Sequence, residues 1–291
     1  MVVFPTETVY GLGADATNDK AVAEIYALKG RPNFNPLIAH VTGAEMAARY
    51  VEITPLAKKL MDLFWPGPLT FVLKRKKDCS VSLLATAGLD TLAVRCPKSK
   101  VALDLIATAD LPIVAPSANT SGQISPTTAF HVKSDFKEKC PFILDDGACS
   151  VGVESTILLA TQEPPVLLRY GGLPVEEIES VIGKVIRPNT DPTTPQSPGQ
   201  MKSHYAPSIP LRMNASSANE GEALLGFGYA PGAVLNLSEK EDLTEAAANL
   251  FSMMHQLDCG KWKGIAVMPV PNRGLGLAIN DRLKRASYKK D

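Results

Sequence analysis

Residues 4–13 read FPTETVYGLG, an apolar start that runs directly into three polar side chains and is followed by two glycines. We interpret the first four residues of the chain as a buried strand that ends at this polar patch. Proline and glycine hold a backbone in extended or sharply turned shapes, so Thr6, Glu7 and Thr8 can point at a ligand. The spacing matches neither a G-x-G-x-x-G dinucleotide fingerprint nor a Walker loop.

Three further polar patches have the same character and alternate with apolar runs. They are KGRP at residues 29–32, APSAN at 115–119 and GVEST at 152–156. The APSAN patch follows an apolar run that we expect to form a buried strand, the position at which α/β folds place ligands. Together with residues 4–13, these patches predict the lining of one pocket, and their hydroxyl, amide and cationic groups suit a polyphosphate and a small polar substrate.

The composition indicates a soluble globular protein. Of the 291 residues 45% are hydrophobic, which suffices for one large domain and a smaller one. Thirty basic residues balance thirty acidic ones, whereas binding to a nucleic-acid backbone needs a basic surplus. The five cysteines show no C-x-x-C spacing and indicate neither a disulfide framework nor a zinc site. No apolar run approaches the roughly 20 residues of a membrane span, so we expect a cytoplasmic protein without a membrane anchor.

Hydrophobic periodicity predicts an α/β or α+β sheet domain in the first part of the chain. Apolar residues recur with a helical period in some segments and alternate or cluster as in strands in others. Helices are expected over residues 18–28, 55–64 and 100–109, and strands over 1–4, 36–41, 69–74, 91–95 and 112–115.

A proline-rich stretch and a second sheet pattern follow. Five prolines, Pro188, Pro192, Pro195, Pro198 and Pro207, predict a semi-rigid extended linker. Beyond it, a strand, a helix, a strand and a helix are expected over residues 232–237, 243–257, 264–269 and 275–287. This order predicts a small doubly wound, Rossmann-like domain. The predicted divisions are a catalytic domain over 1–186, a linker over 187–210 and a C-terminal domain over 211–291.

Lys29 and Arg31 are the clearest candidates for an anion site. Neighbouring cations repel each other, and a phosphate between them would relieve that repulsion through charge-assisted hydrogen bonds. An ordinary solvated helix end is the alternative, because cations also favour the helix dipole there. Turn hydrogen bonds are the alternative for Ser117 and Asn119, and a satisfied core position is the alternative for His40.

The remaining histidines are scattered. His204, together with Tyr205, lies in the linker, where no core explains the pair, so a function is favoured; His131 and His255 are expected at the surface. The histidines lack metal-ligand spacing, so we predict no dedicated metal cage, although Mg²⁺ can arrive with phosphates. No G-x-S-x-G nucleophile motif is present. Catalysis by positioning and charge, as in phosphoryl or nucleotidyl transfer, is therefore favoured.

The patches, in their order and spacing, resemble the YrdC/Sua5 family. The resemblance rests on residues 4–13, 29–32 and 115–119, on NPLI at 35–38, WPGPLT at 65–70 and VEST at 153–156. In the tail, Pro198-Gly199, HYAP at 204–207, GLG at 274–276 and Arg282-Leu283 resemble the longer Sua5 type. The resemblance covers nearly the whole chain and implies a twisted mixed α/β sheet with a deep basic cavity, with the linker folded over it as a lid.

The resemblance also implies an activity. Members of this family are nucleotidyltransferases that form threonylcarbamoyl-AMP and pyrophosphate from L-threonine, bicarbonate and ATP. The product supplies the N6-threonylcarbamoylation of adenosine in tRNAs that read ANN codons, through a downstream transferase machinery. By similarity, Lys29 and Arg31 would be catalytic, and L-threonine would contact Thr8, His40, Arg95 and Ser155. ATP, with its Mg²⁺, would contact Arg31, Asn35, Thr91, Ala115, Ser117, Asn119, Ser125, Arg169, His204 and Tyr205.

The chain departs from the family pattern in three respects. Family members usually carry a helix and a strand before the FPTET strand, so we expect the sheet to lack an edge element. Ser203 stands where a basic residue is expected before His204, which favours weaker phosphate binding by the lid. The C-terminal domain is also short for its type.

Two rival functions remain open. A cavity of this kind could bind double-stranded RNA or tRNA without chemistry, but the zero net charge argues against more than weak RNA binding. The second rival function is the formation of a carbamoyl-adenylate, as in hydrogenase maturation proteins with a related domain. The acylphosphatase and zinc-finger regions of those proteins are not visible in this sequence.

Overall fold

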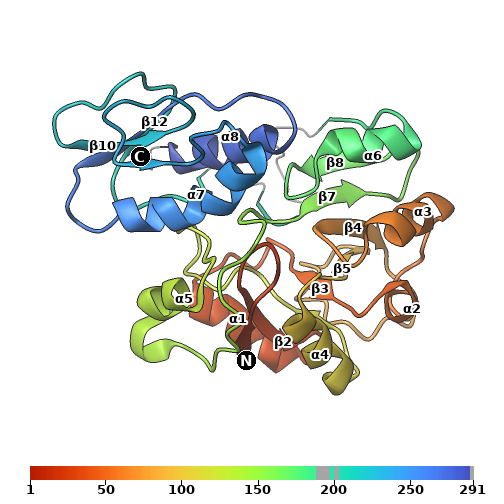
Figure 1. Ribbon diagram of the computed structural model, residues 1–291. Coiled ribbons are helices and arrows are strands. Elements are labelled where there is room, and N and C mark those ends of the chain that lie inside the picture. Colours follow the sequence, from red (N-terminus) through yellow and green to blue (C-terminus); the bar gives the residue numbers. More distant parts are fainter. Residues whose placement is uncertain (188–196, 200–202, 289–291) are drawn as a thin grey trace.

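The computed structural model describes residues 1–187, 197–199 and 203–288, which form two sheets with their helices (Figure 1). The larger sheet has eight strands in the order β1-β2-β6-β3-β5-β4-β7-β8. Its strands are β1 (Val2–Phe4), β2 (Gly11–Asp15), β3 (Ile38–His40), β4 (Leu69–Lys74), β5 (Thr91–Arg95), β6 (Ile113–Val114), β7 (Thr156–Leu159) and β8 (Val166–Arg169). The neighbouring helices are α1 (Asp19–Lys29), α2 (Ala44–Ala47), α3 (Pro55–Phe64), α4 (Lys100–Ala109), α5 (Ala129–Phe136), the 3₁₀ turn η1 (Lys137–Lys139) and α6 (Val175–Ile182).

The larger sheet is mixed, as predicted. The pairs β3/β5 and β4/β7 are parallel, whereas the remaining neighbours are antiparallel. The predicted helices over 55–64 and 100–109 and the strands over 69–74 and 91–95 are confirmed. Both helices begin at a side-chain cap, Thr54 for α3 and Ser99 for α4, whose hydroxyl accepts a hydrogen bond from a first-turn amide. The strands β2, β7 and β8 were not predicted.

The first polar patch forms the connection between β1 and β2 and packs closely on the sheet. A Cβ at Gly13 would lie 2.7 Å from Cε1 of Phe4, and one at Gly11 would lie 3.0 Å from Cβ of Ala115. These two glycines therefore allow strands and an aromatic ring to approach each other. The Thr6 hydroxyl donates to the carbonyl of Val9 at 2.7 Å and fixes the turn between them.

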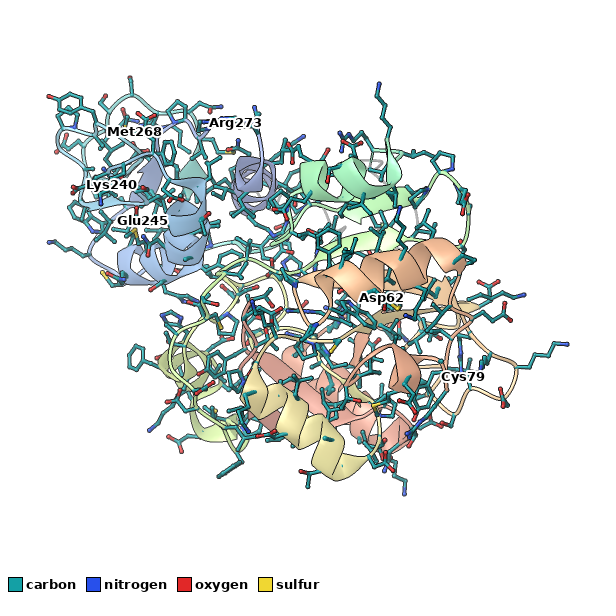
Figure 2. All side chains as sticks on the ribbon, turned by 45° about the vertical axis from the view of Figure 1, so that its right-hand side comes forward. Asp62, Cys79, Lys240, Glu245, Met268 and Arg273 are labelled. Carbon is teal, nitrogen blue, oxygen red and sulfur yellow. The ribbon has the colours of Figure 1, made fainter. Side chains whose placement is uncertain are left out.

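The smaller sheet has four parallel strands in the order β11-β10-β12-β9. These are β9 (Leu211–Arg212), β10 (Glu222–Gly226), β11 (Leu235–Asn236) and β12 (Gly264–Val267), with helices α7 (Leu243–Leu257) and α8 (Leu275–Ala286) packed on each other. The expected α/β character is confirmed, but β9 and β10 were missed. Figure 2 shows Asp62 and Cys79 in the part with the larger sheet, and Lys240, Glu245, Met268 and Arg273 in the other.

The linker and the exact domain divisions stay predictions. Pro188, Pro192 and Pro195 lie outside the described residues, and the last strand of the larger sheet ends at Arg169 whereas β9 begins at Leu211. Within the described ranges no helix is long and apolar enough to cross a membrane.

An apolar cluster joins the two parts of the molecule. Val9, Ile124 and Val153 belong to the part with the larger sheet, yet they are buried together with side chains of α7 and α8. At the same boundary a Cβ on Gly152 would lie 2.4 Å from the carbonyl oxygen of Ala247 in α7. The two parts therefore share buried surface and close backbone contact.

His131 and His255 are not surface residues, which corrects the sequence prediction. Their rings stack across the two parts, with centroids 4.1 Å apart, and His131 is 9% exposed. The Nδ1 atom of His131 accepts a hydrogen bond from the amide of Thr127, and Nε2 of His255 contacts the carbonyl of Ser125. Helix α5 carries His131 and α7 carries His255, so their packing depends on tertiary contacts that local sequence does not encode.

We predict an acid-sensitive contribution of His131 to stability. Burial, followed by the charge of His255, lowers the pKa of His131 from 6.5 to about 4. The unfolded chain then binds a proton that the folded chain does not, so the free energy of unfolding falls as pH falls between about 6.5 and about 4. Urea titrations at neutral pH and at several acidic pH values should show a shallower pH dependence for His131→Gln than for the unsubstituted protein. Equal slopes would contradict this assignment.

Candidate active site

One cavity of about 50 Å³ collects side chains from all four polar patches or their immediate neighbours. It lies at the ends of β3 and β5, against the connection after β6 and the segment before β7, and residues of the linker also line it. The lining residues are Thr6, Thr8, Val9, Gly11, Arg31, Ile38, His40, Arg95, Ala115, Pro116, Ser117, Glu154, Ser155, Arg169, Pro198, Gly199, His204 and Tyr205.

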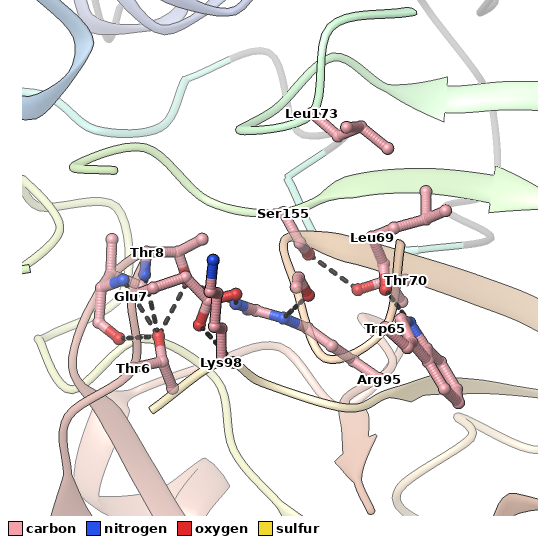
Figure 3. Close-up of polar contacts among 12 residues, drawn as sticks. Thr6, Glu7, Thr8, Trp65, Leu69, Thr70, Arg95, Lys98, Ser155 and Leu173 are labelled. Atoms are coloured by element: carbon pink, nitrogen blue, oxygen red, sulfur yellow. Dashed lines mark hydrogen bonds and ion pairs between the residues drawn. The ribbon is translucent and has the colours of Figure 1, made fainter. Parts of the chain in front are cut away.

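Arg95, at the end of β5, holds the first polar patch in place. Its Nη1 donates to Oγ1 of Thr8 at 2.9 Å, and its Nη2 lies 2.8 Å from Oε1 of Glu7 (Figure 3). Because the Thr6 hydroxyl donates to a carbonyl, the Thr8 hydroxyl donates to Thr6 Oγ1, 2.8 Å away. A buried chain of hydrogen bonds therefore runs from the guanidinium through two threonine hydroxyls.

Ser155 lies beside this chain, at the start of β7, and is fully buried. Its hydroxyl is 2.7 Å from that of Thr70 on β4, as Figure 3 shows, and accepts from Nη2 of Arg169 at 3.2 Å. Nε of Arg169 donates to the carbonyl of Ser155, and its Nη1 donates to the carbonyl of Pro198 in the linker. Arg169 therefore connects the serine to the linker residues that cover the cavity.

His40 faces the cavity as a neutral imidazole. The ring packs edge-on against Phe4, with centroids 5.9 Å apart. Burial, followed by the charge of Arg95, lowers the pKa of His40 to about 3. Its Nδ1 atom has no hydrogen-bond partner among the described residues. A neutral imidazole in the lining of a cavity can hydrogen-bond a ligand as well as complete a core.

Lys29 and Arg31 have different surroundings. Helix α1 ends at Gly30, whose φ of 58° is left-handed, and this sends the two side chains along separate paths. Nζ of Lys29 donates to the carbonyls of Ser117, at 2.6 Å, and Asn119, so this cation holds the APSAN loop. Arg31 lines the cavity and donates to the carbonyls of residues 35 and 36. Burial lowers the pKa of both side chains, that of Arg31 to about 10.

Several predicted ligands lie outside the described lining of the cavity. Asn119 donates through its side chain to the carbonyls of Thr120 and Gln123, and Ser125 donates to Oε1 of Glu154. Thr91 begins β5, four residues and roughly 13 Å of extended chain from Arg95. Asn35 is buried and contributes its carbonyl to Arg31. Lys29 is likewise absent from the described lining.

The linker pair His204–Tyr205 does reach the cavity. Both side chains are buried, with ring centroids 4.0 Å apart. Burial, followed by the charges of Arg31 and Lys29, lowers the pKa of His204 well below its ordinary value. Burial raises the pKa of Tyr205. Both rings are therefore neutral near pH 7.

Sequence reasoning missed Glu154 and gave no role to Arg282. Glu154 is buried and lines the cavity, and Nε of Arg282 on α8 donates to its Oε2 at 2.7 Å. Burial alone would raise the pKa of Glu154, but Arg282 and Arg169 lower it overall. Both residues occur in segments that carried the family resemblance, and that was the only available signal. No group of three or more potential metal ligands is found among the described residues.

The mixed sheet, the smaller parallel sheet and a cavity whose lining includes Arg31, Arg95 and Arg169 define an α/β protein with a second, smaller sheet. Residues 1–171 match the family described as telomere recombination, which includes Sua5, YciO and YrdC, and residues 173–287 match the threonylcarbamoyl-AMP synthase C-terminal domain. The chain therefore belongs to the YrdC/Sua5 family and is of the long Sua5 type.

Relatives resemble the chain over nearly its whole length. The threonylcarbamoyl-AMP synthase of Pyrococcus abyssi is 43% identical, covering 99% of this chain and 90% of its own, and that of Bacillus subtilis is 40% identical, covering 99% and 89%. The crystal structure of P. abyssi Sua5 complexed with L-threonine matches with a TM-score of 0.91 at 41% identity, covering 98% of this chain and 90% of that chain.

A second P. abyssi Sua5 structure carries alanine in place of a histidine and the tyrosine that follows it. It matches with a TM-score of 0.89 at 40% identity, covering 98% of this chain and 88% of that chain. This chain contains a single His-Tyr dipeptide, His204–Tyr205. YciO of Escherichia coli, at 22% identity and a TM-score of 0.53 over 58% of this chain and 82% of that chain, shares the fold of the larger domain.

The variant Lys29→Met tests the hydrogen bonds from Lys29 to the APSAN loop. Two buried carbonyls of the APSAN loop would lose their donor, which should lower the free energy of unfolding by about 2 kcal/mol. Urea unfolding measures this change. Lys20→Met, on the exposed side of the same helix, is the matched control and should remain within about 0.5 kcal/mol of the unsubstituted protein. Equal stability of the two variants would exclude the proposed contact.

Gly171→Ala tests how tightly Ser155 is positioned. A Cβ at Gly171 would lie 2.2 Å from the carbonyl carbon of Ser155 and 2.3 Å from the amide nitrogen of Thr156, so this backbone must shift. We expect destabilisation by about 1–3 kcal/mol in thermal or urea unfolding. Gly43→Ala, where nothing lies within 4 Å of the added Cβ, is the control and should unfold almost as the parent does. A Gly171→Ala variant as stable as this control would disprove the close packing.

Proposed function

We propose that this protein is a threonylcarbamoyl-AMP synthase. It converts L-threonine, bicarbonate and ATP into threonylcarbamoyl-AMP and pyrophosphate, and the product supplies threonylcarbamoylation of tRNA adenosines. Full-length relatives that carry this enzyme name, and a solved relative complexed with L-threonine, support the proposal. The observation that carries it in this chain is a cavity in which arginines lie next to buried hydroxyls.

The charge of the cavity suits the reaction. The amine of threonine forms a carbamate either with CO₂, releasing a proton, or with bicarbonate, releasing water. A carbamate oxygen then bonds to the α-phosphorus of ATP, and the bond from that phosphorus to pyrophosphate breaks. Every reacting group is anionic, so the approach needs cations. Arg31 and Arg169 line the cavity and donate to backbone carbonyls, and neither forms an ion pair with a carboxylate within the described ranges. Their charge therefore remains available to phosphate oxygens.

The hydroxyl side of the cavity suits L-threonine. Thr8 and Ser155 present oxygens that Arg95 and Arg169 hold in fixed positions. The neutral imidazole of His40 lies in the same lining. We assign the polar groups of L-threonine to this side and the nucleotide to the side of Arg31 and Ser117. Mg²⁺ would enter with the triphosphate, since it is commonly held by few protein groups.

The linker would act as a lid. A cavity of about 50 Å³ is far smaller than the roughly 300–1,000 Å³ of a typical small-molecule site. Pro198, Gly199, His204 and Tyr205 line this small space, and a movement of these residues would make room for the substrates. Its return would exclude water from the mixed anhydride formed in the reaction.

The decisive experiment is direct detection of the product. Purified protein is incubated with ATP, Mg²⁺, L-threonine and ¹³C-bicarbonate, and the mixture is examined by mass spectrometry for labelled threonylcarbamoyl-AMP beside pyrophosphate. We expect product only when threonine is present. Arg31→Ala should lower its rate about 100-fold, because a cation that stabilises the transferring phosphate is lost.

Arg49→Ala is the control for the loss of an arginine, since Arg49 pairs with Asp110 on the exposed surface. It should retain the parental rate, and thermal unfolding should confirm that all variants are folded. Absence of a labelled adduct with folded protein would overturn the proposed function. An Arg31→Ala variant with full activity would remove Arg31 from the anion site.

A further inference from the structure

Arg282 of α8 has unusual surroundings for an arginine. It is 0% exposed and is the largest fully buried side chain in the described part of the chain. Its Nε donates to Oε2 of Glu154 at 2.7 Å and its Nη1 to Oδ2 of Asp281 at 2.8 Å, while its guanidinium carbon lies 5.1 Å from the ring centre of Tyr205. Both Glu154 and Tyr205 line the cavity. A residue of the smaller domain therefore touches two separate walls of the site.

Glu154 connects Arg282 to the segment that carries Ser155. One oxygen of the Glu154 carboxylate accepts a hydrogen bond from Arg282, and the other accepts one from the hydroxyl of Ser125. The carbonyl of Glu154 accepts from the amide of Gly172 at 2.9 Å, so both its side chain and its backbone are fixed. Ser155 is the next residue. The backbone that carries Ser155 therefore follows directly from a residue whose carboxylate is held by Arg282 of the other domain.

Tyr205 depends on the smaller domain for a second reason. Its φ of 62° lies in the left-handed region, which a tyrosine adopts only where its surroundings enforce it. The ring packs on Phe251 of α7, with centroids 5.6 Å apart, and against the guanidinium of Arg282. Its neighbour Ala206 donates a backbone hydrogen bond to the carbonyl of Gly122. Helices α7 and α8 thus form the platform that holds a strained residue over the cavity.

We propose that Arg282 is a positioning residue that couples the smaller domain to the reaction. It holds Glu154 beside the proposed L-threonine site and holds Tyr205 over the cavity. This role rests on the proposed synthase function. An apolar side chain could fill the same volume, but it could not orient a carboxylate and an aromatic ring together. The smaller domain therefore serves closure of the site.

The test compares Arg282→Met, Arg282→Met with Glu154→Gln, and Lys284→Met. The double variant removes the buried carboxylate that the single variant leaves unpaired, and so remains informative if the single variant fails to fold. Lys284 is exposed on the same helix and serves as the control. Thermal unfolding gives the folded fraction, and the assay measures both labelled adduct and pyrophosphate.

We expect the double variant to release at least about 5-fold more pyrophosphate per adduct than the parent, because water reaches the anhydride under a displaced Tyr205. A merely structural role would lower adduct and pyrophosphate together and leave their ratio unchanged. Lys284→Met should keep the parental ratio. An unchanged ratio in a folded double variant would overturn the proposal.

A second readout does not require activity. Hydrogen exchange followed by mass spectrometry reports the amides of residues 203–206, of which Ala206 is hydrogen-bonded across to Gly122. These amides should exchange at least about 10-fold faster in the double variant than in the parent or in Lys284→Met. Equal exchange would overturn the positioning role. A parent protein without adduct, combined with faster exchange in the double variant, would overturn the synthase function and leave the positioning of Tyr205 supported.

Discussion

Burial of cationic side chains around one small cavity is the constraint on which the rest of the larger domain depends. A buried cation is destabilising unless oxygen acceptors surround it. Lys29 donates hydrogen bonds to two carbonyls of the APSAN loop, and Arg31 donates to the carbonyls of residues 35 and 36. Arg95 forms an ion pair with Glu7. The polar patches are therefore held in place by the cations that they surround. Because carbonyls carry no full charge, the acceptors of Lys29 and Arg31 keep these two side chains folded inward without cancelling their positive charge, whereas Glu7 balances the charge of Arg95.

Much of the fold could be predicted from local sequence, and the failures have a common cause. Helices α3 and α4 match their predicted bounds because a capping hydroxyl marks each start and an apolar period runs through each helix. Strand β10 was missed because its Glu, Ala and Leu residues favour helices in isolation. It is a strand because β11 and β12 pair with its two edges and because four of its five residues are buried. Tertiary contacts overrode local propensity there, as they did for His131.

The candidate site was predictable as a set of segments and much less as a set of contacts. The patches predicted one pocket from their residue types alone, and ten of the residues inferred by resemblance line the cavity: Thr8, Arg31, His40, Arg95, Ala115, Ser117, Ser155, Arg169, His204 and Tyr205. The Lys29 side chain could not be placed from the sequence, because its direction depends on the left-handed turn at Gly30 and on a hydrogen bond to Ser117, 88 residues away. The pairing of Glu154 with Arg282 spans 128 residues, a separation at which no local pattern carries information.

The shared apolar cluster and this long-range ion pair have a consequence for biosynthesis. Domains generally fold in order as they leave the ribosome. The larger domain emerges with Val9, Val153 and the Glu154 carboxylate uncovered, because their partners lie on α7 and α8 near the end of the chain. Until those helices are translated, the nascent chain exposes an apolar surface next to a charged group that chaperones can recognise. The electrostatic environment of the pocket is therefore completed only after α8 has been translated.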